Sequence, residues 1–416
     1  MDLRFSTQRV IDRCHELAKI SEKTEYILRR YLTEAHKNAN ALVAKWMQES
    51  GMTVWQDQVG NQWGRYDGTD SKLPALVIGS HLDTVPDAGQ YDGIIGVMLG
   101  IEIVERLSSG NKRLPFPIEI VGFGDEEGVR FGTAFLGSHG VTGNWRDDWL
   151  QIKDKEGKSL YQSMLDFGLD PQDKYLSIRS PSSILGYWEI HIEQGPKLES
   201  LGLPLGVVTG IAGARRATLM IQGKAGHAGT TPMNLRKDAL CVASEIILAV
   251  EELAKNSTYE AVATSGQVFV NPGATNVISG SVALSLDVRA VKDEFRDDLI
   301  LRISNEVDLI ASRRSVQILW QWDHEAKSVM CDDAYQQLFS QALKNSGLET
   351  ESLFSGAGHD AMAMATICPV GMVFIRSPDG LSHHPDESII FSDVTKAIQV
   401  TESALTSYAE TFGESQ

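Results

Sequence analysis

The sequence has little cysteine, a deficit of basic residues and no long apolar run. Its four cysteines are far apart and form no CxxC pair, which argues against a disulfide framework and a cysteine-based zinc site. Lys and Arg number 38 against 55 Asp and Glu, and the net charge of -17 excludes the basic surface that nucleic-acid binding needs. No stretch approaches the roughly 20 apolar residues of a membrane span, and the first residues lack the apolar segment of a signal peptide. We therefore expect a cytoplasmic protein that acts on a small molecule, with no nucleic-acid or membrane partner.

What the chain does contain is typical of a globular protein with more than one domain. Apolar residues make up 42% and charged residues 22% of its 416 residues, so a large core is expected. Apolar residues at helical spacing predict two helices within residues 6–50 and another at 93–107. The apolar runs 74–80 and 118–123 predict buried strands on either side of the latter helix. Strand, helix and strand in succession indicate an α/β sheet.

The pattern changes at about Ala214 and changes back near residue 328. A helix at 334–346 and a buried strand at 371–375 resume the α/β pattern. We therefore expect a catalytic domain of residues 1–213 and 328–416, interrupted by a smaller α+β domain of residues 214–327. The elements expected in the smaller domain are a strand at 217–221, a helix at 238–253, a strand at 282–288 and a helix at 294–311.

The first candidate site motif is GSHLDTV at residues 79–85, followed by Asp92 and Gly93. Open α/β sheets place ligands at the ends of their strands, and this motif follows a predicted strand. In a His-x-Asp pair, His81 can coordinate a metal while Asp83 fixes its tautomer. Asp92 could bridge two cations. The alternative is that Asp92 only caps a helix and that His81 is an ordinary loop histidine.

The second motif is the run Asp125-Glu126-Glu127 after the strand at 118–123. Clustered like charges are unfavourable unless cations or protons offset them. Because adjacent side chains point in different directions, one carboxylate can bind a metal while its neighbour acts as a general base. A solvated acidic turn is the alternative.

Two further motifs complete the set. Alternation over residues 188–194 predicts a strand with His191 on the same face as Glu189 and Glu193. Gly356-Ala357-Gly358-His359-Asp360 is followed by Ser382-His383-His384-Pro385-Asp386-Glu387. None of these motifs is specific alone, whereas their combination is.

In this order the motifs GSHLDTV, YDG, DEEG, HIEQG, GHAGTTP, TNV, DVR, SGAGHDA and LSHHPDE resemble the amidase branch of the aminoacylase and carboxypeptidase-G metallohydrolases. That branch, the hydantoinase/carbamoylase amidases, includes N-carbamoyl-L-amino acid hydrolases, β-ureidopropionases and allantoate amidohydrolases. The resemblance spans nearly the whole chain, and HIEQG with GHAGTTP is its most specific part. It implies an α/β, dinuclear-metal exopeptidase-like catalytic domain with an inserted lid and dimerisation domain, hence a homodimer.

The resemblance also implies a role for individual residues. One metal would be held by His81 and His191, the other by Glu127 and His383, with Asp92 bridging them. Glu126 would be the general base, and Asp83 would orient His81. The substrate contacts implied by the resemblance are Gln194, His227, Asn276, Arg289, Gly358 and His359. Of these, Arg289 suits a bidentate grip on a carboxylate, and Asn276 and His227 would stabilise charge on the carbonyl oxygen.

The resemblance favours hydrolysis of the terminal ureido C–N bond of allantoate, giving ureidoglycine, ammonia and carbon dioxide. Peptidase branches usually carry an acidic residue at the position of His191, so the histidine argues for a ureido substrate. Hydrolysis of N-carbamoyl-L-amino acids or of a β-ureidopropionase substrate, a dinuclear exopeptidase, and a metal-binding scaffold without catalysis remain as alternatives. The ligands suit two Zn²⁺, Mn²⁺, Co²⁺ or Ni²⁺ ions alike, with Zn²⁺ or Mn²⁺ favoured.

Overall fold

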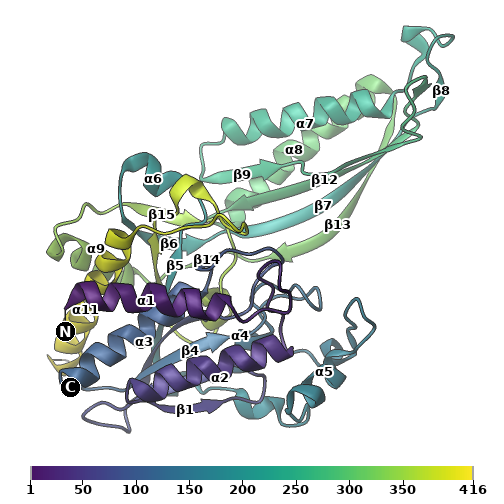
Figure 1. The fold of residues 1–416 in the computed structure, drawn as a ribbon. Coiled ribbons are helices and arrows are strands. Elements are labelled where there is room, and N and C mark those ends of the chain that lie inside the picture. The colour runs from purple at the N-terminus through teal and green to yellow at the C-terminus, as the bar shows by residue number, and fades with distance from the viewer. Residues whose placement is uncertain (1, 415–416) are drawn as a thin grey trace. The chain divides into compact units, whose positions relative to one another are not determined.

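A computed structural model describes residues 2–414, and Figure 1 shows its helices and strands. The chain divides into two compact units. Unit 1 comprises Met1–Thr209, Cys331–Leu353 and Gly358–Gln416, and unit 2 comprises Gly210–Met330 and Phe354–Ala357. The sequence predicted a smaller domain of residues 214–327. Unit 2 begins and ends a few residues outside these bounds and also includes the short segment 354–357.

Unit 1 begins with two helices, as the spacing predicted. Helix α1 (Leu3–Ala18) starts where Asp2 accepts a hydrogen bond from the Arg4 amide, and Thr33 caps α2 (Glu34–Glu49) in the same way. The segment between them is a loop, although Tyr26 and Leu28 matched the helical spacing. There the Leu28 amide donates to the Ser21 hydroxyl at 2.9 Å, and this side-chain bond replaces helical bonding.

The larger sheet, most of which belongs to unit 1, has a parallel centre and antiparallel margins. Its order is β1-β2-β4-β3-β5-β16-β6-β14, with β15 paired to β6. Strands β4, β3, β5 and β16 are parallel, whereas β2 and β6 run antiparallel to their neighbours in the centre. The strands are β1 (Thr53–Gln56), β2 (Gln62–Tyr66), β3 (Ala75–His81), β4 (Ile118–Phe123), β5 (Ile184–Ile192), β6 (Leu205–Ile211), β14 (Val329–Met330), β15 (Ser352–Ser355) and β16 (Val370–Ile375).

The parallel strands lie deep in the core. Every residue of β3, β4 and β16 is buried, as expected for parallel strands covered on both faces. Helix α3 (Ile94–Ser109) packs against β3, β4 and β5, and Gly96 permits the close approach because an added Cβ would lie 2.2 Å from the Ile190 carbonyl oxygen. The other helices of unit 1 are α4 (Leu136–Thr142), α5 (Leu160–Phe167), α6 (Lys197–Leu201), α9 (Asp333–Asn345), α10 (Ala361–Met364) and α11 (Phe391–Glu414).

The order of the parallel strands creates a place for a ligand. From β3 the chain crosses through α3 to β4 on one side, whereas β5 lies on the other side of β3. Open α/β sheets bind ligands at such a switch point, outside the carboxyl ends of the strands. His81 is the last residue of β3, and His191 is the penultimate residue of β5.

Unit 2 is an antiparallel sheet with two helices on one face. The order is β10-β12-β7-β13 with β9 paired to β12, and β8 and β11 form a separate ribbon. In β12, residues alternate between half-buried and buried, and the buried set contacts the helices. The elements are β7 (Gly213–Gln222), β8 (Gly226–His227), α7 (Ala239–Lys255), β9 (Ala261–Thr264), β10 (Val268–Asn271), β11 (Val277–Ile278), β12 (Ser281–Ala290), α8 (Asp293–Arg314) and β13 (Gln317–Ala326).

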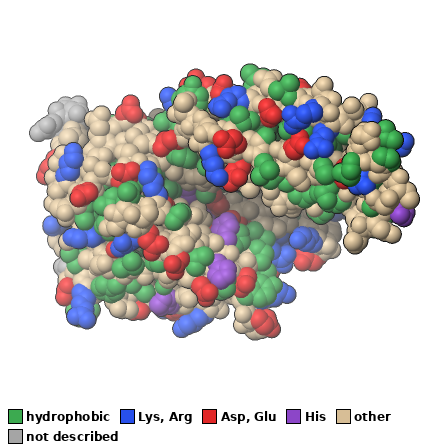
Figure 2. Space-filling model, turned by 90° about the horizontal axis from the view of Figure 1, so that it is seen from above, with side chains coloured by type: hydrophobic (Ala, Val, Ile, Leu, Met, Phe, Trp, Pro, Cys, Tyr) green, Lys and Arg blue, Asp and Glu red, His purple; other side chains and the backbone are tan. Residues whose placement is uncertain are grey.

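The surface carries charges of both signs. Figure 2 shows acidic and basic side chains interspersed over the visible face. Among residues 2–414, no helix is long and apolar enough to cross a membrane.

Candidate active site

The loop after β3 places His81 and Asp83 in the interior. Both are almost fully buried, so His81 is not an ordinary exposed loop histidine. Its Nδ1 lies 3.1 Å from the Asp83 carbonyl oxygen and 3.6 Å from the Asp83 carboxylate. The Asp83 carboxylate accepts the backbone amides of Glu126 at 3.0 Å and Glu127 at 3.1 Å. Asp83 therefore joins the first two motifs, in addition to lying beside His81.

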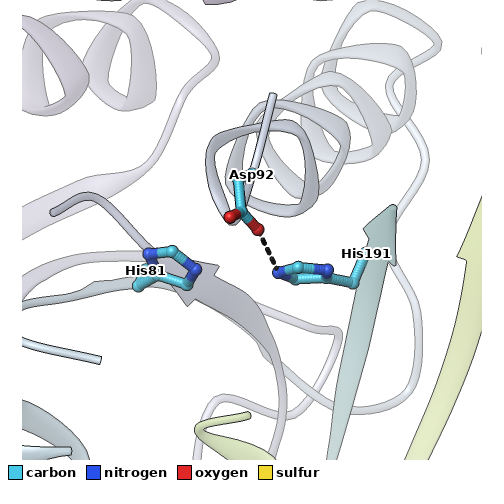
Figure 3. Close-up of side chains that lie close together, drawn as sticks. All are labelled: His81, Asp92 and His191. Atoms are coloured by element: carbon cyan, nitrogen blue, oxygen red, sulfur yellow. Dashed lines mark ion pairs between the residues drawn. The ribbon is translucent and has the colours of Figure 1, made fainter. Parts of the chain in front are cut away.

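Asp92 stands before α3 but does not cap it. The N-cap is Gly93, and no side chain caps this helix end. The Asp92 carboxylate instead lies 3.3 Å from His191 Nε2, and Figure 3 shows it pointing at that ring beside the ring of His81. Gly93 adopts φ +69°, and a Cβ there would lie 2.3 Å from His81 Nε2. The glycine thus allows the two motifs to meet.

On its other side, Asp92 meets the loop that carries His383. His383 Nε2 lies 3.1 Å from Asp92 Oδ2 and 3.3 Å from Glu127 Oε1. Gln194 donates its amide to both Asp92 oxygens at 3.0 and 3.1 Å. Gln194 and His383 both have positive φ, a strained conformation often found at functional sites.

These side chains form overlapping groups with the spacing of metal ligands. His81, Asp92 and His191 form one group, and Asp92, Glu127 and His383 form another. Asp92 is common to both, and His81 also groups with Glu126 and Glu127. The structure thus brings together all five residues that the sequence suggested as ligands, together with Glu126.

Burial and mutual repulsion perturb the acids of this cluster. Burial raises the pKa of Glu126 well above its ordinary value, and Glu127 adds to this while His81 opposes it. Burial also raises the pKa of Glu127, against a hydrogen bond from His383. Hydrogen bonds to Asp92 and Glu127 raise the pKa of His383 to about 10. Burial therefore disfavours the charged forms of Glu126 and Glu127, and cations held here would offset that cost.

The donor set fits divalent cations. Imidazole nitrogens with carboxylate oxygens are typical ligands of Zn²⁺, Mn²⁺, Co²⁺ and Ni²⁺. The cluster is almost completely buried except at His383, and its acids repel one another. Residues with this chemistry could hold a cation in each of the two groups that share Asp92.

Asp125, the first acid of the second motif, has a different environment. Its side chain is buried, and both carboxylate oxygens lack a hydrogen-bond partner in the described structure. Burial, reinforced by Asp83, raises its pKa well above the ordinary value. Asp125 belongs to none of the ligand groups, and the three consecutive carboxylates are not a solvated turn.

The sequence did not single out a role for Glu387, although it lies in the LSHHPDE motif. Its Oε1 accepts the backbone amides of Tyr91 at 2.8 Å and Asp92 at 3.1 Å. Its Oε2 accepts the hydroxyl of Ser382, the residue before His383, at 3.2 Å. Glu387 therefore connects the segments that carry Asp92 and His383. The only sequence signal was its position in the motif.

A second buried group lies against His191. The ring of His359 is 4.5 Å from that of His191 in a T-shaped contact, and only 1% of His359 is exposed. Glu189 accepts the Ser80 hydroxyl at 2.8 Å and the Ala361 amide at 3.1 Å. The 358–361 segment thus packs behind a candidate ligand. Gly358 sits against Phe135, 2.8 Å from where a Cβ would stand.

The remaining candidates for substrate binding belong to unit 2. His227 lies on β8 opposite Val277 of β11, and the Ala228 amide donates to the Asn276 carbonyl oxygen at 3.0 Å. The structure therefore makes His227 and Asn276 neighbours. Arg289 lies on β12, where Asp287 binds it through two hydrogen bonds of 2.9 Å.

Comparisons with known proteins show the family of this chain. The family described as Peptidase family M20/M25/M40 matches residues 77–407. Allantoate deiminase 2 of Glycine max is 39% identical over 425 residues, covering 95% of this chain and 88% of that protein. An N-carbamoyl-L-amino acid amidohydrolase of Geobacillus stearothermophilus is 40% identical over 381 residues, covering 91% and 93%.

A solved structure is similar in fold. The crystal structure of a hydantoinase/carbamoylase family amidase from Burkholderia multivorans has a TM-score of 0.90 at 32% identity, covering 97% of this chain and 98% of that one. Together these similarities confirm the expected α/β fold class, the resemblance carried by the motifs and the expected class of enzyme, a hydrolase of C–N bonds.

Proposed function

Because the chain belongs to peptidase family M20/M25/M40, we propose that it uses two divalent cations to hydrolyse the terminal ureido C–N bond of allantoate. The products are ureidoglycine, ammonia and carbon dioxide. The observation that carries the proposal is the position of Asp92, which belongs to both ligand groups. The similarity to allantoate deiminase 2 of Glycine max supports the choice of substrate.

The proposal assigns His81 and His191 to one cation, and Glu127 and His383 to the other. When bound, two cations lower the pKa of a water molecule and polarise the scissile carbonyl. Glu126 takes a proton from the attacking water and delivers it to the leaving nitrogen. Its burial and its position beside His81 suit this role. The carbamate that leaves decomposes to ammonia and carbon dioxide.

The proposal also gives each of the remaining candidate residues a role in substrate binding. Arg289 grips the substrate carboxylate, and His227 with Asn276 stabilises the developing oxyanion. Gln194 contacts the ureido group, as does the loop at Gly358 and His359. The hydrogen bonds of Gln194 to Asp92 place its amide at the candidate ligands. His359 contributes through its packing on His191.

Unit 2 also supports the proposed homodimer. The ribbon that carries His227 and Asn276 leads directly into the start of β12, whereas Arg289 lies near the end of that strand. Eight residues separate Ser281 from Arg289, which corresponds to about 25 Å of extended chain. A substrate as small as allantoate cannot span that distance. A second copy of the chain would bring both kinds of contact to one substrate molecule, and this supports the proposed homodimer.

A second candidate is hydrolysis of N-carbamoyl-L-amino acids. The 40% identity to the Geobacillus stearothermophilus amidohydrolase favours it, and such substrates also present a ureido group beside a carboxylate. The shared chemistry means that the ligand groups and Arg289 fit either substrate.

The decisive experiment uses metal-stripped protein resupplied separately with Mn²⁺, Zn²⁺, Co²⁺ or Ni²⁺. Ammonia release is measured from allantoate and from a panel of N-carbamoyl-L-amino acids. We expect turnover that depends on added metal, with allantoate strongly preferred. Preference for a carbamoyl amino acid would establish the second candidate. If neither class of substrate is hydrolysed, both candidate functions are refuted. A dinuclear exopeptidase or a metal-binding scaffold without catalysis would then remain.

A further inference from the structure

Three charged side chains form a row on the open face of the unit 2 sheet. Arg216 on β7 and Asp287 on β12 are direct cross-strand partners, and Arg216 Nε donates to Asp287 Oδ2 at 2.8 Å. Arg289, two residues along β12, donates to both oxygens of the same carboxylate. One aspartate is thus bound by two arginines.

This row borders a cavity. The cavity is about 670 Å³ in volume, and it is lined mainly by polar residues of the sheet face opposite the helices. Its charged lining residues are Arg216, Asp287, Arg289 and Asp323. The side chains of the row are between about a quarter and a half exposed, so a ligand in the cavity can reach them.

The contacts of Arg289 leave part of its guanidinium available. Nε and Nη2 donate to Asp287, and Nη1 donates to the Gly356 carbonyl oxygen at 2.7 Å. A guanidinium has five N–H donors, so two remain for a ligand. Asp287 and Gly356 therefore fix the orientation of Arg289.

Asp287 fixes Arg289 but also cancels its charge. A lone Arg289–Asp287 pair would be neutral overall and would attract an anion weakly. Asp323, whose carboxylate accepts the Thr218 hydroxyl at 2.7 Å, is a second acid in the cavity lining. Arg216 adds a second cation, so these four charged side chains sum to zero, whereas without Arg216 they would carry one net negative charge. Burial lowers the pKa of His324, and the charges of Arg216 and Arg289 add to this while Asp287 opposes it.

We propose that Arg216 determines specificity for substrates with a carboxylate, because it offsets the negative charge that Asp287 and Asp323 place beside Arg289. This inference rests on the proposed function, in which Arg289 grips the substrate carboxylate. Arg216 acts through charge and through Asp287, and Arg289 makes the direct contact. A purely structural ion pair between strands would not distinguish anionic from neutral substrates.

The chain offers a matched control in the adjacent residue. Arg215 points to the opposite face of β7, where it lies over the Trp322 ring and within 3.9 Å of Asp297 on α8. Arg215→Gln removes the same charge from the same strand on the helix side. Arg216→Lys keeps the charge at the site, whereas Arg216→Gln removes it.

The experiment measures kcat/KM of the metal-loaded enzyme for an acid substrate and its neutral carboxamide. The acid is allantoate or N-carbamoyl-L-alanine, whichever the wild type hydrolyses. For Arg216→Gln we expect the acid-to-amide preference to fall about fivefold, mainly through KM for the acid, as is typical of an exposed charge. This fall in preference should be smaller in 0.5 M salt, because the Debye length is then only about 3 to 5 Å and the charge of Arg216 is screened. Arg216→Lys should retain most of the preference.

Other results would contradict either this inference or the proposed function. The inference is overturned if Arg216→Gln lowers kcat/KM equally for acid and amide, or changes the preference no more than Arg215→Gln does. It is also overturned if Arg216→Lys loses as much preference as Arg216→Gln. An unchanged KM for the acid in Arg289→Gln would instead refute the proposed carboxylate grip. A wild type that hydrolyses neither acid would refute the proposed function and this inference with it.

Discussion

The carboxylate of Asp83 accepts the backbone amides of Glu126 and Glu127, at 3.0 and 3.1 Å, and so fixes the candidate base and a candidate ligand relative to His81. Both oxygens of Asp83 are used in this way. An ionised carboxylate forms stronger hydrogen bonds to amides than a neutral group does. Asp83 thus has a broader role than orienting one imidazole.

Replacing Asp83 with Asn should weaken metal binding. The carboxamide introduced by Asp83→Asn has a single acceptor oxygen in place of two, so one of the two backbone amides loses its partner and the Glu126–Glu127 turn is freed to move. Loss of such a supporting contact typically lowers metal affinity by about 10- to 100-fold. Calorimetric titration of Mn²⁺ into metal-stripped protein measures this. Asp87→Asn, an exposed change in the same loop, is the control, and equal affinities in the two variants would contradict the prediction.

Glu126 and Glu127 should separate catalysis from metal binding. Glu126→Gln should keep metal affinity near the wild-type value while kcat falls by about 10²- to 10⁴-fold, the usual contribution of a general base. Glu127→Gln should lower metal affinity itself, because Glu127 groups with Asp92 and His383. Metal content after dialysis and steady-state rates distinguish these results. An unchanged kcat in Glu126→Gln would show that Glu126 is not the general base.

Much of the fold could be predicted because the central strands are apolar and short. The run at 118–123 became β4 with identical bounds, and the run at 74–80 became β3, shifted by one residue. Local patterns could not predict which strands pair, nor the helices α4 and α5 between residues 136 and 167. Those helices are short, and their hydrophobic contacts come from distant segments such as Tyr31 and Val59.

The ligand set was implied by the family resemblance, and its members carry metal-binding side chains at or beyond the ends of strands. The residues that hold these ligands in place could not be predicted from local sequence. Glu387, for example, accepts the backbone amides of Tyr91 and Asp92, which lie about 300 positions away in the sequence. The contacts of the Asp92 side chain could not be predicted from local sequence either. Sequence left open whether it caps a helix, and only its contacts with His191 and His383 decide otherwise.

The metal-free protein should become less stable between about pH 7 and 8.5. The pKa of His383 is about 10 in the folded protein, against an ordinary value of 6.5. The folded state therefore binds this proton more tightly, so the stabilisation is complete below about pH 6.5 and is lost as the pH rises through 10. The raised pKa of Glu126 acts in the same direction.

Thermal unfolding of metal-stripped protein at several pH values tests this expectation. Bound metal should flatten the pH dependence, because a coordinating imidazole carries no proton at its ligand nitrogen. His383→Gln should also flatten it in the metal-free protein. A midpoint temperature that rises between about pH 7 and 8.5 without metal would contradict the sign derived from linkage.

Gly93 should be essential for the approach of Asp92 to His81. Gly93→Ala places a Cβ 2.3 Å from His81 Nε2, so the imidazole must leave its position. The substitution also strains the backbone, which has φ +69° and ψ −47° there, by roughly 1–3 kcal/mol. Gly132→Ala is the matched control, because Gly132 has φ +70° and nothing lies within 4 Å of its added Cβ. Both substitutions place an alanine at positive φ and should lower the midpoint of thermal unfolding, whereas Gly93→Ala alone should lose Mn²⁺ affinity. Equal Mn²⁺ affinity in the two variants would show that His81 does not need the space that Gly93 leaves.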